Sequence, residues 1–212
     1  MQFNPACRRC PRLVAHLDYV KNQYPDYHAR PVPAFGDADP RLLIVGLAPG
    51  LHGANRTGRP FTGDHAGILL YDTLHKFGFA TAPVSESRHD GLRLIDCRIT
   101  NAVKCLPPDN KPVTVEIARC NSYLSAELKV FSRLRVVLAL GTIAHESVVK
   151  ALGLKRKDYP FVHGISHCLP GSLKLYDSYH CSRYNTQTRR LTAAMFHAVF
   201  AGICGELSKD KS

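Results

Sequence analysis

The chain has no tryptophan, only two methionines among 212 residues, and no uninterrupted apolar stretch of about 18 residues, the length that spans a membrane. It also lacks the GxxxxGK[ST] signature of a phosphate loop, so nothing indicates nucleoside-triphosphate binding. No apolar segment followed by a cleavage site stands at the N-terminus. These absences predict a cytoplasmic protein without membrane contact.

Acidic residues are also scarce. Seventeen Asp and Glu stand against 28 Lys and Arg, which gives a formal net charge of +11. Such an excess attracts polyanions over long distances, so the leading predicted partner is DNA or RNA. Basic charge that serves only solubility is the alternative, and charge alone does not decide between them.

Four apolar runs have the length and composition of buried strands, and helical patterns alternate with them. The predicted strands are Arg41–Gly46, Leu94–Val103, Leu134–Gly141 and Leu173–Tyr179. The predicted helices are His65–Phe77, one capped by Thr114 and running to Phe131, one capped by Thr142 and ending near Gly153, and Gln187–Leu207. This alternation indicates a parallel sheet covered on both faces. Residues 1–212 are predicted to form one domain, with a frayed tail at 208–212.

In a reducing compartment the eight cysteines are not expected to form disulfides, so cysteines that cluster predict a metal centre. A CxxC near the N-terminus, a cysteine after the second strand and one in the next helix supply four candidate thiolates: Cys7, Cys10, Cys105 and Cys120. Their spacing alone leaves zinc and an iron–sulfur cluster equally open. The other cysteines are predicted to have no ligand role: Cys97, Cys168, Cys181 and Cys204.

The remaining motifs follow the predicted strands, where open parallel sheets bind their ligands. GLAPG (46–50) leads into LHGANRTGRPFTGDHAG (51–67), ITNAVKCLPP spans 99–108, and SYHCSRYNTQTRR spans 178–190. In this order the motifs resemble the iron–sulfur branch of the uracil-DNA glycosylases. GLAPGLHGANRTGRPFTGD in particular is similar to family 5, and the resemblance extends from Cys7 to about Leu191.

The resemblance implies a three-layer αβα fold with a short, mainly parallel four-stranded sheet. It also implies a structural [4Fe–4S] cluster on the four cysteines named above. The implied reaction is hydrolysis of a base–sugar bond in DNA, which needs hydrogen-bond donors at the departing base and a positioned water at the sugar.

Four side chains meet these needs. His180 is predicted to donate to the leaving base, and Asn101 offers the donor and acceptor that read a pyrimidine edge. Phe61 is predicted to stack on the flipped base, with a core aromatic as the alternative. Asp64 is either the residue that orients the water or a helix N-cap, and both roles are compatible.

Further residues are assigned by their loops. The substrate pocket is predicted to include Gly46, Ala48, Pro49, Gly50 and His52 beside Phe61, Asn101 and His180. Predicted DNA contacts are Arg56, Arg59, Ser182, Arg183, Tyr184, Asn185, Arg189 and Arg190. The chain departs from the family pattern at Cys181, where proline is expected after the histidine, and this puts the efficiency of catalysis in question.

The sequence therefore predicts a monomeric, monofunctional glycosylase that excises uracil, and also hypoxanthine or other damaged bases, from DNA. No lysine occupies a position suited to a Schiff-base nucleophile. In a prokaryote such a protein is expected at the nucleoid. The rival hypothesis is a non-catalytic, zinc-bound nucleic-acid-binding module, and a thiol redox protein is a weaker third.

Overall fold

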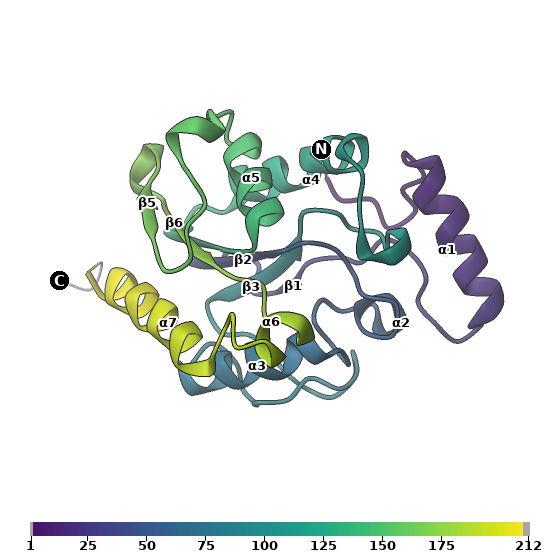
Figure 1. Cartoon of the computed structure of the whole chain (residues 1–212), viewed down its shortest axis with the longest axis horizontal. Coiled ribbons are helices and arrows are strands. Elements are labelled where there is room, and N and C mark those ends of the chain that lie inside the picture. Colours follow the sequence, from purple (N-terminus) through teal and green to yellow (C-terminus); the bar gives the residue numbers. More distant parts are fainter. Residues whose placement is uncertain (1, 210–212) are drawn as a thin grey trace.

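The computed structural model describes residues 2–209, and its elements alternate between strands and helices as predicted (Figure 1). The strands are β1 (Phe35–Gly36), β2 (Leu42–Gly46), β3 (Cys97–Asn101), β4 (Val136–Leu140), β5 (Ser166–Cys168) and β6 (Lys174–Ser178). The helices are α1 (Pro11–Gln23), α2 (Ala54–Thr57), α3 (His65–Lys76), α4 (Thr114–Val130), α5 (Thr142–Ala151), α6 (Arg183–Gln187) and α7 (Ala193–Ser208).

The sheet has six strands in the order β1-β3-β2-β4-β6-β5, so the predicted count of four is wrong. The four predicted strands form the central parallel part. The additional strands, β1 and β5, are two and three residues long and pair antiparallel at the two edges. Strands this short are not detectable as hydrophobic runs.

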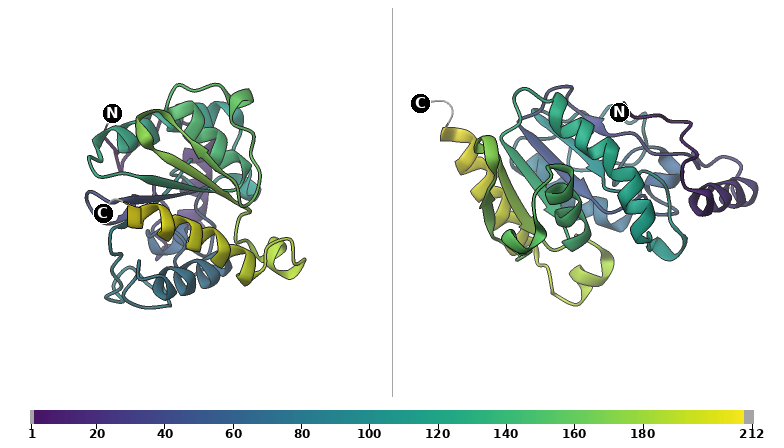
Figure 2. Two further views of the ribbon diagram at one scale, coloured as in Figure 1. Left: turned by 90° about the vertical axis from the view of Figure 1, so that its left-hand side faces the viewer. Right: turned by 90° about the horizontal axis from the view of Figure 1, so that it is seen from above.

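Helices cover both faces of the sheet, as the end-on view in Figure 2 shows. Alternate residues of β2 point to opposite faces: Leu42 and Ile44 join the core cluster that includes residues of α3 and α7, whereas Leu43 and Val45 join the one that includes residues of α4 and α5. The predicted αβα layering is thus present. A strand buried on both faces reads as a continuous apolar run, and LLIVG is such a run.

Several predicted boundaries need correction. Thr114 and Thr142 are first helical residues, and the N-caps are Val113 and Gly141. The predicted final helix, Gln187–Leu207, begins too early: α7 starts at Ala193, and Gln187 is the last residue of the separate short helix α6. Of the predicted tail, Ser208 belongs to α7 and Lys209 is its C-cap, while 210–212 lie outside the described residues. No helix between residues 2 and 209 combines the length and apolarity needed to cross a membrane.

Candidate active site

The carboxyl ends of the parallel strands carry the predicted catalytic residues. Asn101 is the last residue of β3, directly beside Gly46 at the end of β2, and His180 comes two residues after β6. Asp64 reaches the same edge from the start of α3. These three side chains and Phe61 line one pocket of about 410 Å³, so residues from distant parts of the sequence meet where the sheet topology predicts a ligand.

The side chains of Asn101 and Phe61 can lie against the backbone of residue 46 because that residue is glycine. A Cβ at Gly46 would lie 2.5 Å from Asn101 Oδ1 and 2.7 Å from Phe61 Cζ. Asn101 is 4% exposed, and Oδ1 has no hydrogen-bond partner within residues 2–209. A buried amide oxygen without a partner is costly, so it is poised to accept a hydrogen bond from a ligand.

Phe61 packs in the core and at the same time lines the pocket. Its φ of 54° is in the left-handed region, which is unfavourable for a bulky side chain. Its ring lies 5.8 Å from that of His180, with 29° between the planes. Both sequence hypotheses for Phe61 therefore describe its position, and strained backbone of this kind concentrates at functional sites.

Asp64 is the N-cap of α3. Its Oδ1 accepts a hydrogen bond of 2.9 Å from the Gly67 amide, while Oδ2 lies beside Gly50 and Gly53 at the pocket. Burial raises the pKa of Asp64, although the amides of Gly67 and Ala66 oppose that shift. The structure thus confirms the predicted N-cap and leaves one carboxylate oxygen facing the pocket.

His180 is neutral at physiological pH, since burial lowers its pKa to about 4. A neutral imidazole still carries one N–H that can donate to a leaving group. A histidine that titrates near pH 7 would suit this role less well, because its charge would change within the working range. The His180 carbonyl accepts a hydrogen bond of 2.8 Å from Asn185 Nδ2. Asn185, predicted to contact DNA, therefore supports the segment that carries His180.

The other predicted pocket residues divide into three groups. Ala48 and Gly50 line the pocket, and Gly46 lies behind it. Pro49 is buried outside the lining. His52 is exposed, bonds through Nδ1 to Tyr27 Oη at 2.9 Å and does not line this pocket. Its place in the motif gave no sign of the aromatic pair Tyr24 and Tyr27 that it contacts.

Four residues that line the pocket were not predicted: Leu47, Ala54, Ala66 and Asn110. Asn110 lines the pocket from the turn after β3, and both Asn110 and Asp109 have positive φ angles of 56° and 54°. Asn and Asp adopt this conformation more readily than other non-glycine residues. The PPDN sequence of residues 107–110 was the available signal for such a turn.

The predicted DNA contacts also separate. Arg56, Arg183, Tyr184, Arg189 and Arg190 are exposed, and Arg183 lines the pocket. Ser182 lines it as well and is the N-cap of α6. These exposed side chains can reach a phosphate backbone, so their predicted contacts with DNA remain a prediction.

Arg59 is the exception, because it is 4% exposed and its guanidinium is used internally. It donates to Asp90 Oδ1 at 2.9 Å and to Thr62 Oγ1 at 2.9 Å, and it lies 4.7 Å from the Phe35 ring centroid. The prediction that it contacts DNA is therefore corrected. Its partner Asp90 lies in an irregular segment that the sequence pattern did not connect to residue 59.

Arg59→Ala is accordingly expected to act on stability. Asp90 itself is solvent-accessible, so the loss comes from the hydrogen bonds that the buried guanidinium makes to Asp90 and Thr62, and it should lower the free energy of unfolding by about 1–3 kcal/mol. Denaturant unfolding measures this loss. Arg56→Ala, at an exposed position in the same motif, is the matched control and should leave unfolding unchanged. Equal stability of the two variants would contradict the internal role of Arg59.

A second candidate centre lies at the base of α1. Cys7, Cys10, Cys105 and Cys120 surround one small cavity, together with Leu13 and Tyr123. Burial raises the pKa of Cys105 to about 12, and the neighbouring thiols Cys120, Cys7 and Cys10 raise it further. Within residues 2–209, no three of these sulfur atoms lie within 4.8 Å of one another. The structure therefore brings the four predicted cysteine ligands around one cavity.

Comparison with known sequences matches the Uracil DNA glycosylase superfamily to residues 33–203. The chain belongs to this superfamily. A type-5 uracil-DNA glycosylase of Thermus thermophilus is 48% identical over 201 residues, which cover 92% of this chain and 91% of that protein. Type-5 enzymes of Mycobacterium leprae and Pyrobaculum aerophilum are 43% and 44% identical, covering 92% and 88% of this chain and 88% and 82% of their own lengths.

These matches confirm the predicted resemblance to family 5 of the uracil-DNA glycosylase superfamily. Similarity to type-4 members is lower, as in the protein of Thermotoga maritima, 37% identical over 110 residues and 51% of this chain. Membership weakens the rival hypothesis of a non-catalytic module, because the superfamily is named for an enzymatic activity and the catalytic motifs meet in one pocket.

Proposed function

We propose that this protein is a monofunctional uracil-DNA glycosylase that also accepts other deaminated bases. The observation that carries the proposal is the meeting of Asp64, Asn101, Phe61 and His180 in one pocket at the carboxyl ends of β2, β3 and β6. The type-5 enzymes named above support uracil as the substrate.

The proposed reaction gives each of these residues a step. A base rotated out of the duplex stacks on Phe61, and the free Asn101 Oδ1 accepts the imide N–H of uracil. As the base–sugar bond breaks, negative charge grows on the base, and the neutral His180 stabilises it by donating a hydrogen bond. Asp64 Oδ2 orients the water that attacks the sugar.

Hydrolysis without a covalent intermediate fits the pocket lining, which contains no lysine among the described residues. Lys104 lies three residues after Asn101, but its ammonium is buried against Thr100 and Glu127. A Schiff base therefore has no candidate amine at the site, and the product is an abasic site.

We also propose that the four cysteines hold a [4Fe–4S] cluster. All four thiols line one cavity, and the resemblance to the iron–sulfur branch of the glycosylases supports a cluster there over a zinc ion on the same ligands. Iron–sulfur clusters bind thiolates and are larger. Its chemistry here is structural: it joins the N-terminal segment to α4 and to the loop after Asn101, alongside the Arg12–Glu116 ion pair.

The first test uses duplex oligonucleotides with uracil opposite guanine or hypoxanthine opposite thymine. Strand breaks that need alkali establish a monofunctional glycosylase and show which bases are taken. His180→Ala should slow single-turnover excision by about 100-fold or more, as removal of one transition-state donor does elsewhere. Breakage without alkali would contradict the monofunctional assignment, and intact strands would contradict the enzymatic one.

The pH profile tests the assigned protonation states. Excision should rise with pH through the raised pKa of Asp64, because only its carboxylate orients water, and should reach a plateau around neutral pH. His180 stays neutral across this plateau. Asp64→Asn keeps the helix cap and should remove the acid limb together with most of the rate. An unchanged acid limb in Asp64→Asn would assign that limb to another group.

A further inference from the structure

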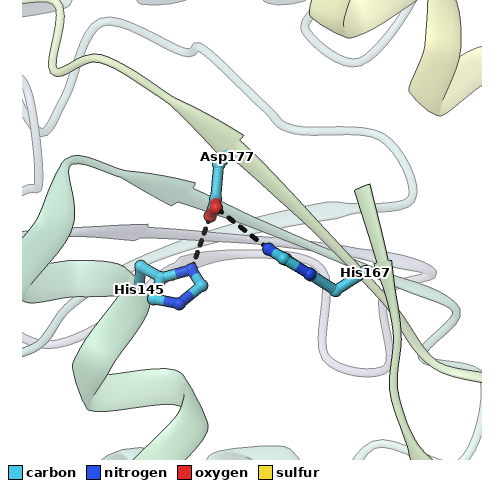
Figure 3. A group of neighbouring side chains, drawn as sticks. All are labelled: His145, His167 and Asp177. Carbon is cyan, nitrogen blue, oxygen red and sulfur yellow. Dashed lines mark hydrogen bonds and ion pairs between the residues drawn. The ribbon is translucent and has the colours of Figure 1, made fainter. Parts of the chain in front are cut away.

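A second buried group of titratable side chains lies behind the active site. His145 of α5, His167 of β5 and Asp177 of β6 turn towards one another (Figure 3), and their facing atoms lie within 4.8 Å of one another. The Asp177 side chain is completely buried and that of His145 is 2% exposed. Neither the sequence motifs nor the proposed reaction uses this group.

Both ring nitrogens of His145 face hydrogen-bond acceptors. Nδ1 lies 2.7 Å from Asp177 Oδ1, and Nε2 lies 2.8 Å from the Tyr159 carbonyl oxygen. A carbonyl has no proton to give, and Asp177 also accepts from the Val162 amide at 3.3 Å. A neutral imidazole carries only one N–H, so with Asp177 as a carboxylate both bonds form only if the ring is doubly protonated.

Charged and titratable groups from several elements lie near His145. Glu146 of α5 pairs with Arg156 of the following turn, and Lys157 lines the same surface hollow as His145. From β5, His167 Nε2 lies 3.5 Å from Asp177 Oδ2. Burial lowers the pKa of His145, but the hydrogen bond and charge of Asp177, the Tyr159 carbonyl and the charge of Glu146 together outweigh it, and the pKa is raised.

A metal ion is the other cation that two histidines and an aspartate suggest. Ligand atoms around tetrahedral zinc stand about 3.3 Å apart, given Zn–N bonds of about 2.0–2.1 Å. At 2.7 Å, His145 Nδ1 and Asp177 Oδ1 are closer than two ligands of one ion and have the separation of a charge-assisted hydrogen bond. The geometry therefore favours a proton.

This ion pair fastens one segment around the end of β6. The Asp177 backbone bonds to Ile165 and Gly164 at 3.0 and 2.9 Å. Two residues further on, the Tyr179 amide donates to His163 Nδ1 at 3.1 Å, and the two rings stack at 4.7 Å. His180 is the next residue. The Arg190 guanidinium lies 4.5 Å from the Tyr179 ring centroid, so the same strand end also supports the exposed basic loop.

We propose that His145 is an imidazolium, charged at neutral pH. Through Asp177 and the 159–165 segment it positions the end of β6, and with it the leaving-group donor His180. This role rests on the proposed glycosylase function. His145 touches no substrate, and it acts only by fixing where Tyr179 and His180 stand. Deprotonation removes one of its two hydrogen bonds, so the positioning weakens as pH rises through the raised pKa.

The charge is tested without substrate by ¹⁵N NMR of the histidine rings in the whole, cluster-loaded protein. At pH 7.5, both His145 nitrogens should have the shifts of a protonated ring, while His180 should have those of a neutral ring. In His145→Gln, the His180 ring signal should move. A neutral His145 ring, or zinc bound to it in the purified protein, would overturn the proposal.

The kinetic test compares single-turnover excision by His145→Gln and Asp177→Asn across pH. Each should lose about tenfold or more in rate with unchanged DNA affinity, as misplacement of a reacting group predicts. The fall of the wild-type rate at alkaline pH should be absent in His145→Gln. His75→Gln, which removes an imidazole bonded to the Ala80 carbonyl elsewhere, is the matched control and should behave as wild type.

The outcomes separate the two hypotheses. If the wild-type protein leaves uracil in place, the glycosylase function fails, while the NMR signals still report on the charge of His145 and on the place of His180. A lower melting temperature with an unchanged rate and pH profile would make the ion pair merely structural and overturn the positioning role. If the variants do not fold, the ring shifts of the unmodified protein still decide whether the charge exists.

Discussion

Replacing Gly53 by alanine is expected to reduce single-turnover uracil excision by about 100-fold or more, close to the loss expected for Asp64→Asn. A Cβ at residue 53 would lie 2.4 Å from Asp64 Cβ, 2.5 Å from Oδ2 and 2.8 Å from Cγ. These distances are too short for any contact, and the nearest atom, Asp64 Cβ, is attached to the backbone. The loop at residue 53 or the start of α3 must therefore shift, and the carboxylate leaves the place from which it orients water. Excision from the uracil duplex measures the effect.

The Gly53 variant should keep the fold, because the collision is confined to the loop at residue 53 and the start of α3, at the edge of the pocket. Gly205→Ala in α7 is the matched control, since a Cβ there meets no atom within 4 Å. Its rate should equal that of the wild type. A Gly53→Ala protein that excises uracil at full speed would show that Asp64 does not need its present position, and would remove it from the mechanism.

Cys105→Ser and Cys120→Ser are expected to abolish the broad visible absorbance of the purified protein and its bound iron. The free energy of unfolding should fall by more than about 3 kcal/mol, since the binding energy of a structural metal centre contributes directly to folding. Iron content, absorbance and denaturant unfolding measure these effects. The loss should reach beyond the N-terminal segment, because Cys105 lies only four residues after Asn101.

Cys168→Ser provides the control, because Cys168 is exposed on β5 and lies outside the ligand set. It should keep both colour and stability. A colourless wild-type protein with one zinc ion per chain would replace the cluster by the rival zinc hypothesis. Retention of iron by Cys105→Ser would instead contradict the assignment of that ligand.

The central part of the fold was predictable because its strands are buried on both faces. LLIVG and the runs leading to Asn101 and His180 read as strands, and parallel topology then brings their carboxyl ends together. The four cysteines were found from the CxxC and from the resemblance to family 5. These features depend on local composition or on a linked series of motifs.

What the sequence did not reveal depends on partners far along the chain. Arg59 is charged and lies in a glycine-rich motif, and only its contact with Asp90 makes it internal. His145 and Asp177 belong to different elements, and their pairing needs the register of β4 against β6. Asn110 reaches the pocket through two left-handed residues. Hydrophobic periodicity contains no information on such contacts.

Asp64 serves both the fold and the proposed reaction, and this limits which residues can replace it during evolution. One oxygen begins α3 and the other faces the reaction, so loss of the side chain damages folding and activity together. Asparagine caps helices as well as aspartate but cannot act as a carboxylate. A descendant released from selection for excision, yet still selected to fold, is therefore expected to carry asparagine or serine at position 64, and a survey of natural variants for that exchange would identify silent copies of the enzyme.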